Sequence, residues 1–237
     1  MDKNKKHLII GQGEVGQSLF NVLSPHYSYV AMHDKDQSFA QKFGVMHICY
    51  PFVNHFIWIT KEYIKQYNPK LVIIHSTVPV GITRKISSIA VHSPIRGTHP
   101  NLEDGIKTFV KYFGGKKAEE ASKIFSDIGV PTQCLERPET TEAIKLWDTL
   151  QYGVMIMLEK EIHRYCKRKR VEFGFVYTDA NETYNEGYKK LGVPEVLRPI
   201  LRHVKGGIGG HCIIPNAKLL SIDSWLAKLL VERNEDY

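Results

Sequence analysis

A glycine-rich stretch near the start of the chain, LIIGQGEVGQSL, constrains the fold more than any other feature. Gly11, Gly13 and Gly16 have G-x-G-x-x-G spacing, directly between a short apolar run and an amphipathic run. In such a turn the first glycine permits a tight bend, the second lets a phosphate approach the backbone, and the third lets helix and strand pack closely. The stretch therefore predicts a buried strand that turns at once into a helix.

The same turn predicts a dinucleotide site, because a helix N-terminus offers N–H groups and a partial positive charge to phosphates. Asp34 ends the next predicted strand, 23 residues after Gly11, where a carboxylate would bind a ribose 2′-hydroxyl and repel a 2′-phosphate. This favours NAD over NADP, although Lys35 follows directly. The alternative is a glycine turn that serves packing alone, with Asp34 as a helix cap. The expected cofactor-binding residues here are Gly11, Gly13, Glu14, Val15, Gly16 and Asp34.

Short apolar runs alternate with amphipathic stretches over the first 135 residues. This alternation predicts an α/β fold of Rossmann type, a doubly wound and mostly parallel sheet with helices on both faces. The predicted strands cover 7–10, 27–34, 45–51, 70–77, 89–94, 109–115 and, at an edge, 131–136. The predicted helices cover 13–26, 52–67 and 117–129.

The pattern changes near residue 137, where a long proline-free run with apolar residues at helical spacing begins. We expect a dinucleotide-binding domain over 1–136 and an all-helical domain over 137–237. A helix over 139–170 is longer than a compact domain needs, which indicates a spine that links two regions or a dimer interface. Further helices are predicted over 176–192, 194–204 and 217–234.

Composition narrows the class of protein. The chain is 43% apolar and carries a formal net charge of +7, and it has no apolar run of about 18 residues that would cross a membrane. Its start does not read as a signal peptide. The cysteines are dispersed without zinc-type pairing, so we expect no metal site and reduced thiols in the cytoplasm. The basic run 163–170 is either a solvated helix end or an anion-binding patch, and no nucleic-acid motif accompanies it.

Several stretches, in order, resemble one family, the UDP-glucose/GDP-mannose dehydrogenases, and especially the branch that oxidises UDP-N-acetylmannosamine. They are GQGEVG, ICYPF, STVPVGITRKI, SPIRG, TTEAIKLWDTLQY and GGIGGHCIIPN. The resemblance implies NAD as cofactor, with Tyr50, Pro51, Ser76 and Thr77 in its site, and a small-molecule substrate of the nucleotide-sugar kind. By analogy with the family's central helix, the helix over 139–170 also implies a homodimer. Such enzymes oxidise a sugar C6 alcohol to a carboxylate through a cysteine thiohemiacetal and thioester.

On this resemblance Cys212 matches the family nucleophile, and Lys145 matches a lysine that stabilises an oxyanion at C6. His211 matches a flanking histidine of the mannosamine branch, or it is a loop residue without chemical role. A plain buried thiol at Cys212 and a solvated helix lysine at Lys145 are the alternatives. Cys212 and His211 as a metal-binding pair are improbable, because adjacent residues rarely chelate together.

Three positions depart from the family. Asn216 stands where the family has an aspartate that acts as a base or holds water, and an amide cannot accept a proton. Thr149 replaces an asparagine, and Ile95 replaces a glutamate that helps to hydrolyse the thioester. The matched stretches also cover only the first two domains of the family, without the third that holds the substrate's nucleotide. We therefore expect impaired four-electron oxidation and a weak grip on a nucleotide sugar.

Two functions remain open at this point. The first, which the residues favour, is an NAD-dependent oxidoreductase that acts on a CH–OH group with Cys212, Lys145, Asn216 and Thr149 in its catalytic site. The second is a catalytically degenerate NAD-binding module with a role in regulation or assembly. A loss of turnover in Cys212→Ser would separate the first from the second.

Overall fold

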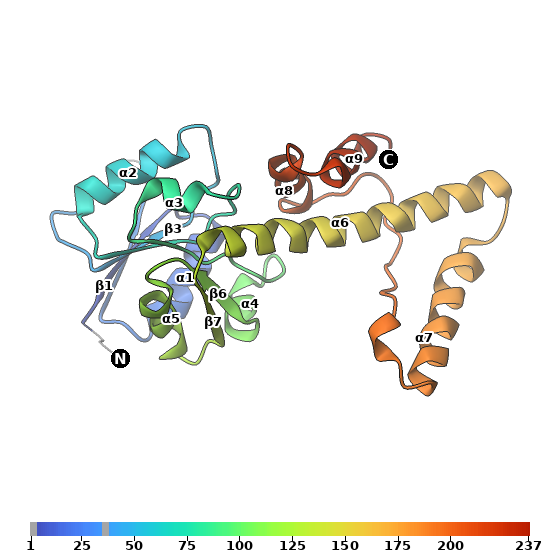
Figure 1. Cartoon of the computed structure of the whole chain (residues 1–237), viewed down its shortest axis with the longest axis horizontal. Helices are drawn as coiled ribbons and strands as arrows, with labels where there is room; N and C mark the ends of the chain where they lie inside the picture. The colour runs from blue at the N-terminus through green and yellow to red at the C-terminus, as the bar shows by residue number, and fades with distance from the viewer. Residues whose placement is uncertain (1–3, 35–37) are drawn as a thin grey trace. The chain divides into compact units, whose positions relative to one another are not determined.

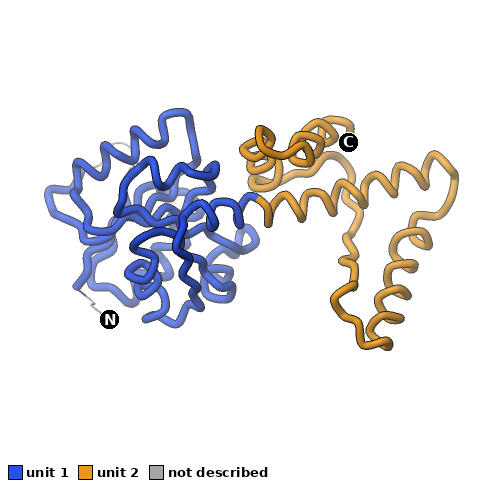
Figure 2. The backbone as a smooth tube through the Cα atoms, viewed as in Figure 1, with its two compact units in different colours: residues 1–146 blue, residues 147–237 orange. Residues whose placement is uncertain are grey.

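A computed structural model describes residues 4–34 and 38–237 of the chain (Figure 1). Lys35, which bears on the choice between NAD and NADP, lies outside the described residues. The chain divides into two compact units, Met1–Leu146 and Trp147–Tyr237 (Figure 2). Each unit is described by itself below.

The first unit is built on a seven-stranded sheet with the order β2-β1-β3-β4-β5-β6-β7. The strands from β1 to β5 pair in parallel, β6 is antiparallel to β5, and β7 is parallel to β6. The predicted mostly parallel Rossmann-type sheet is therefore confirmed, with β7 at the predicted edge. The strands are β1 Lys6–Ile10, β2 Tyr29–His33, β3 Val45–Ile48, β4 Leu71–Ile74, β5 Ala90–His92, β6 Lys111–Gly114 and β7 Thr132–Leu135.

Helices cover both faces of this sheet, as Figure 1 shows. One face packs on apolar residues of α1, α4 and α5, and the other packs on those of α2 and α3. Because both faces are covered, the central strands are apolar almost throughout, which explains their clear sequence signal. The sequence analysis predicted neither α3 nor α4, since each is short. The helices of this unit are α1 Glu14–Leu23, α2 Phe56–Tyr67, α3 Ile82–Ile86, α4 Leu102–Thr108 and α5 Ala118–Ser126.

A chain of buried histidines crosses the face that α1, α4 and α5 cover. His75 Nδ1 lies 2.8 Å from Ser93 O, His47 Nδ1 lies 3.0 Å from His75 Nε2, and His7 Nδ1 lies 3.0 Å from His47 Nε2. A carbonyl oxygen only accepts, so His75 donates from Nδ1 and accepts at Nε2, and the same tautomer follows for His47 and His7. The Lys111 amine joins this chain, 3.1 Å from Ser93 O and 3.3 Å from His75 Nδ1.

Burial keeps these groups neutral. Desolvation lowers the pKa of His7 to about 4 and the pKa values of His47 and His75 well below their usual range. Desolvation also lowers the pKa of Lys111 to about 7, although the ring faces of Phe113 and Phe125 lie 5.6 and 5.2 Å from its amine. The first unit therefore has a buried cluster of basic side chains, His7, His47, His75 and Lys111, which the apolar pattern of its strands does not predict.

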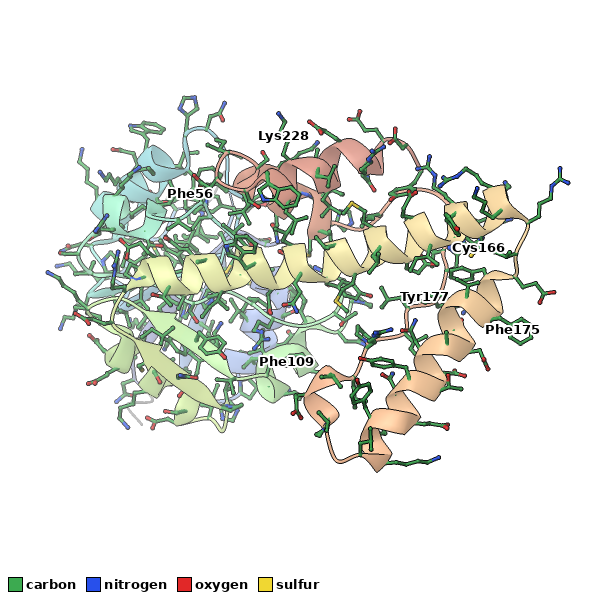
Figure 3. All side chains as sticks on the ribbon, turned by 45° about the vertical axis from the view of Figure 1, so that its right-hand side comes forward. Phe56, Phe109, Cys166, Phe175, Tyr177 and Lys228 are labelled. Carbon is green, nitrogen blue, oxygen red and sulfur yellow. The ribbon has the colours of Figure 1, made fainter. Side chains whose placement is uncertain are left out.

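The second unit is all-helical, as predicted. Its long helix α6, Pro138–Lys169, starts within the first unit. The π-helical turn η1, Gly174–Asp179, leads into α7, Ala180–Lys190. Figure 3 shows Phe175 and Tyr177 on opposite sides of this segment. Tyr177 is buried and stacks on Phe173, whereas Phe175 is 67% exposed.

The predicted helix over 194–204 is wrong. Only a single 3-10 turn, η2 Pro194–Val196, forms there, and the segment that follows is extended. Pro199 lacks an N–H and disfavours a helical conformation at the residue before it. That residue, Arg198, instead has its backbone N–H and C=O bound by the side chain of Asn185, each at 2.8 Å.

The predicted helix over 217–234 is also wrong in part, because two helices occupy this region. Helix α8, Ile213–Leu220, begins earlier than predicted, and Pro215 is tolerated because it lies in the first turn. Helix α9, Trp225–Asn234, starts anew where the Ser224 hydroxyl accepts the N–H of Ala227. The cap residue therefore interrupts a pattern that reads as continuous.

Candidate functional site

The turn between β1 and α1 has the geometry that its glycines predict. Gly11 has φ of +102°, and its N–H donates to His33 O at 3.0 Å. A Cβ on Gly11 would lie 3.0 Å from Tyr50 N, and one on Gly16 would lie 2.0 Å from Gly11 O. Any larger side chain at Gly16 would therefore force helix and strand apart, so this glycine serves close packing.

Gly13 differs from the other two, because a Cβ there would have no heavy atom within 4 Å. Gly13 is also the N-cap of α1, and as a glycine it has no side chain to cap that helix end. The space beside Gly13 is open, so a pyrophosphate there could accept hydrogen bonds from the first N–H groups of α1. The turn lies where the strand order reverses, since β1 stands between β2 and β3, and such switch points are where α/β sheets bind ligands.

The other predicted cofactor residues lie around this turn. Asp34 is exposed and directly follows β2. Val15 packs partly against the core. Glu14, the first residue of α1, places Oε2 2.6 Å from His99 Nδ1. The turn thus fits a dinucleotide. The N-terminus of α1 would hold the phosphates, and the carboxylate of Glu14 lies at that same helix end.

Tyr50 and Ser76 use their side chains in structural bonds. Ser76 Oγ donates to Tyr50 O at 2.6 Å, which ties the end of β4 to the end of β3. Thr60 Oγ1 donates to Phe56 O at 2.7 Å, so the Tyr50 hydroxyl, 2.6 Å away, donates to Thr60. Burial raises the pKa of Tyr50, which keeps the phenol protonated. Pro51 is exposed and Thr77 is half-buried.

The start of α6 is anchored to the segment after β4 by residues to which sequence analysis assigned no role. The buried carboxylate of Glu142 accepts the N–H groups of Gly81 and Thr83, the latter at 2.8 Å, and so caps the N-terminus of α3. Desolvation raises the pKa of Glu142 despite these bonds. The buried His92 links the same elements, with Nδ1 2.8 Å from Thr141 Oγ1. The only sequence signal for Glu142 was its position three residues before Lys145, in the stretch TTEAIKLWDTLQY.

Lys145 lies one turn further along α6. Its amine donates to Ile95 O at 2.8 Å, and the lysine is half-buried. The Ile95 side chain is 6% exposed and belongs to the apolar core of the first unit. The structure thus places Lys145, which matches the family lysine, beside Ile95, which replaces the family glutamate. The Ile95 side chain packs in the apolar core.

The other two departing positions meet in the second unit. Asn216 on α8 is 6% exposed, and its Nδ2 donates to Thr149 Oγ1 on α6 at 3.2 Å. An amide and a hydroxyl therefore form a neutral pair where the resemblance implies a carboxylate and an amide. Cys212 is half-buried at the N-cap of α8, and its carbonyl accepts the N–H of Asn216 at 3.0 Å. His211 is exposed.

The segment before Cys212 is held by buried charges on α6. Glu159 Oε1 lies 2.8 Å from His203 Nδ1, and the Lys160 amine donates to Val204 O and Gly206 O at 2.6 Å each. Both α6 residues are at most 4% exposed. A long extended segment needs partners for its backbone groups, and these side chains supply them. The sequence analysis predicted the helix that carries Glu159 and Lys160 but assigned neither residue a role.

Lys145 belongs to the first unit, whereas Thr149, Cys212 and Asn216 belong to the second. All four cysteines are thiols rather than disulfides. Within the described ranges, no group of three His, Cys, Asp or Glu residues is arranged to hold a metal ion. No helix in that part of the chain is both long and apolar enough to cross a membrane.

The sequence matches no family model, and none of the curated proteins matches it. Solved structures do match its fold. A UDP-N-acetyl-D-mannosamine dehydrogenase from Pyrococcus horikoshii has a TM-score of 0.77 at 18% identity, over 97% of this chain and 68% of that one. A UDP-glucose dehydrogenase from Pyrobaculum islandicum has a TM-score of 0.70 at 16% identity, over 99% and 69%.

A third match is close to this chain in length. The 3-hydroxyisobutyrate dehydrogenase from Mycobacterium tuberculosis has a TM-score of 0.67 at 11% identity, over 98% of this chain and 93% of that one. The chain spans about two thirds of the nucleotide-sugar dehydrogenases that it matches. At these identities the likeness shows the fold alone, a Rossmann-type unit and a helical unit, shared with these dehydrogenases.

Proposed function

We propose that this chain is an NAD-dependent oxidoreductase related to the UDP-glucose/GDP-mannose dehydrogenases, located in the cytoplasm. The observation that carries the proposal is the β1–α1 turn, where Gly11 and Gly16 are sterically required and the N-terminus of α1 faces open space at Gly13. This is the arrangement that a pyrophosphate needs. The exposed Asp34 after β2 favours an unphosphorylated ribose, and hence NAD.

NAD, when bound, accepts a hydride from the carbon of a CH–OH group. For that transfer the chain must hold the alcohol carbon and take up the hydroxyl proton. We assign Lys145 to the developing oxyanion, since its ammonium already donates to an oxygen acceptor, Ile95 O. We assign Cys212 as the nucleophile that adds to the resulting aldehyde through Sγ, with the carbonyl oxygen taking up a proton.

The pair of Asn216 and Thr149 limits how far this chemistry proceeds. Release of a thioester from Cys212 needs a water molecule and a group that accepts its proton. The amide of Asn216 cannot accept a proton, and its Nδ2 is bonded to the Thr149 hydroxyl. We therefore propose a two-electron reaction that stops at, or starts from, the aldehyde, with the aldehyde carbon bound to Cys212 Sγ. The substrate is a small polar molecule of the sugar class, and nucleotide sugars are the first candidates.

The alternative is an NAD-binding module without catalysis. One observation favours it: all three departing positions make structural contacts of their own. Ile95 is packed in the core, and Asn216 is buried and paired with Thr149. Both functions include binding of the dinucleotide. They differ in whether the Cys212 thiol reacts with a substrate.

Cofactor binding is tested first. Calorimetric titration with NAD and NADP should show binding of NAD, with NADP weaker, and thermal melting should shift upward by mass action. Gly13→Asp places a carboxylate in the open space at the helix end and should abolish binding without unfolding, because no heavy atom lies within 4 Å of that Cβ. Failure of wild type to bind either dinucleotide would overturn both functions.

Catalysis is tested next, with a panel of nucleotide sugars and 3-hydroxy acids and absorbance of NADH as the readout. The proposal expects turnover that falls at least about a hundredfold in Lys145→Met. Cys212→Ser should also lose its activity, with NAD affinity kept. Turnover that survives in Cys212→Ser would exclude the thiol mechanism, and no turnover with any substrate would favour the binding module.

A further inference from the structure

One pocket of the first unit lies away from the β1–α1 turn and is lined by described residues. It has a volume of about 650 Å³, the size of a small-molecule site. Strand β6 is antiparallel to β5, with Gly114 opposite His92, and β7 is parallel to β6. The chain that follows β6 therefore runs toward Ala90, the first residue of β5, and a Cβ on Gly115 would lie 3.0 Å from Ala90 O. The pocket opens there, at the sheet end opposite to the dinucleotide turn. Its lining includes Arg84, Ser87, Lys116, Cys134, Glu136 and Arg137.

Two helices begin at this pocket. Helix α5 starts at Ala118, and the side chain of its N-cap residue, Lys117, makes no capping hydrogen bond; Glu119 and Glu120 lie in its first turn. Helix α6 starts at Pro138, which also lines the pocket. Helix N-termini carry partial positive charge, so the two ends together favour an anionic group in the space between them.

Two arginines share one carboxylate at the pocket wall. Arg84 Nε lies 3.2 Å from Glu139 Oε1, and Arg137 Nε lies 3.6 Å from Glu139 Oε2. The arginine side chains are 71% and 67% exposed, whereas that of Glu139 is 11% exposed. Neither arginine makes another ion pair with a described residue. Their Nη groups therefore remain available to a ligand, with Glu139 holding the two guanidinium groups at one place.

Glu139 itself also lacks a partner of good geometry. Its Oε1 is buried and accepts no hydrogen bond from a described residue, although Arg84 Nε lies 3.2 Å away. A buried acceptor without a donor costs free energy that a ligand hydroxyl would recover. Glu119 and Glu136 line the same pocket and offer further acceptors.

We propose that this pocket is a second ligand site, which binds a small phosphorylated polyol such as a sugar phosphate. The phosphate lies at the N-termini of α5 and α6 and accepts hydrogen bonds from Arg84 and Arg137. The hydroxyl groups donate to Glu139 and to the neighbouring carboxylates. A ligand with an anionic end and a donor-rich end is the one that satisfies both kinds of group in this wall.

Calorimetry with ribose 5-phosphate tests the site, with ribose as the probe that lacks the anion. Ribose 5-phosphate should bind and ribose should not. Arg84→Gln and Arg137→Gln each remove one charge-assisted contact and should weaken binding at least about tenfold. Arg168→Gln is the matched control, because Arg168 is an exposed arginine in an ion pair that does not line the pocket. It should leave the affinity unchanged.

The thiol of Cys134 gives a second readout, because it is exposed and lines the pocket. Bound ribose 5-phosphate should slow its alkylation by iodoacetamide, followed by mass spectrometry of the Cys134 peptide, and should leave the alkylation of Cys212 unchanged. Absence of binding at millimolar ribose 5-phosphate would overturn the proposal. Equal affinity in Arg84→Gln, Arg137→Gln and wild type would overturn it as well, whatever the outcome for NAD.

Discussion

Lys111 is the most unusual residue in the interior of the first unit. It is 4% exposed, and its amine contacts a backbone carbonyl, the His75 ring and two phenylalanine rings. A buried ammonium is costly unless it is paired with an opposite charge. The folded chain avoids that cost by releasing a proton, which is the meaning of the pKa of about 7.

We predict that stability falls as the pH is lowered from 10.5 to 7. In that window the unfolded chain binds a proton at Lys111 that the folded chain does not bind, so protonation favours unfolding. The contribution is on the order of 3–5 kcal/mol in the free energy of unfolding. A second loss follows between pH 6.5 and about 3, where His7, with a pKa of about 4, and His92, with a pKa of about 3, stay neutral in the folded chain.

Lys111→Met isolates the first window, because it keeps the apolar stem and removes the amine. Urea unfolding at pH 7 and pH 9.5 should show the variant gaining stability relative to wild type at pH 7, with a clearly smaller relative gain at pH 9.5. Lys61→Met, an exposed lysine, is the control for net charge. A wild-type and a Lys111→Met curve that run parallel across this range would contradict the predicted deprotonation.

Glu14 is a second single residue with a testable effect, in this case on the affinity for NAD. Its carboxylate lies at the N-terminus of α1, paired with His99, where the phosphates of a dinucleotide would be held. Removal of this negative charge should strengthen NAD binding about two- to fivefold, the size of a charge effect at a helix end. Calorimetry of Glu14→Gln measures it, and a markedly weaker affinity would mean that the carboxylate contacts the cofactor favourably.

At the scale of elements, one glycine decides how the helices of the second unit pack. Gly153 lies inside α6, where glycine is unfavourable for a helix by about 1 kcal/mol. A Cβ there would lie 2.6 Å from Ile213 Cγ2 and 2.7 Å from Leu230 Cδ2. The missing side chain is therefore what lets α8 and α9 approach α6, and α8 carries Cys212 at its N-cap.

Gly153→Val should destabilise the chain by about 1–3 kcal/mol through overpacking. It should also speed alkylation of Cys212, since α8 is displaced. Gly187→Val is the matched control, because Gly187 on α7 has no heavy atom within 4 Å of its Cβ position. Melting temperature and alkylation rate measure both effects, and equal changes in the two variants would show that helix propensity, not packing, is responsible.

At the scale of the whole molecule, the second unit leaves many apolar side chains in solvent. Helix α7 has no buried residue. Leu191, which follows its last residue, is 73% exposed, and Phe175 in the preceding turn η1 is 67% exposed. Val171 and Val176 are 46% and 45% exposed. Exposed apolar residues gathered in one segment indicate an interaction site. A second copy of the chain is the partner that we propose, in line with the expected homodimer.

Light scattering should therefore give a mass of twice 27.2 kDa. The double variant Phe175→Asp and Leu191→Asp should shift the mass to that of a monomer, because it places charges in the apolar contact. Trp58→Asp is the control, an equally exposed aromatic of the first unit. A monomeric wild type at high concentration would contradict the dimer.

The sequence by itself determined the sheet and the place of the cofactor turn. Strands buried on both faces are continuous apolar runs, and Gly11 and Gly16 stand where only glycine fits, so both features are written in local sequence. The long helix was equally clear from its period. The helix over 194–204 was predicted wrongly, because its pattern is overridden by Pro199 and by side chains distant in sequence, among them Asn185 and Lys160.

Only the tertiary structure decided what the chemistry-bearing residues contact. It joined Asn216 to Thr149, turned Ile95 into the core, and made Glu142 the cap of a helix some 60 positions earlier in the chain. It also gathered Arg84, Arg137 and Glu139 at one pocket. Contacts of this kind depend on the distance between elements in space, and no local period or motif in the sequence encodes that distance.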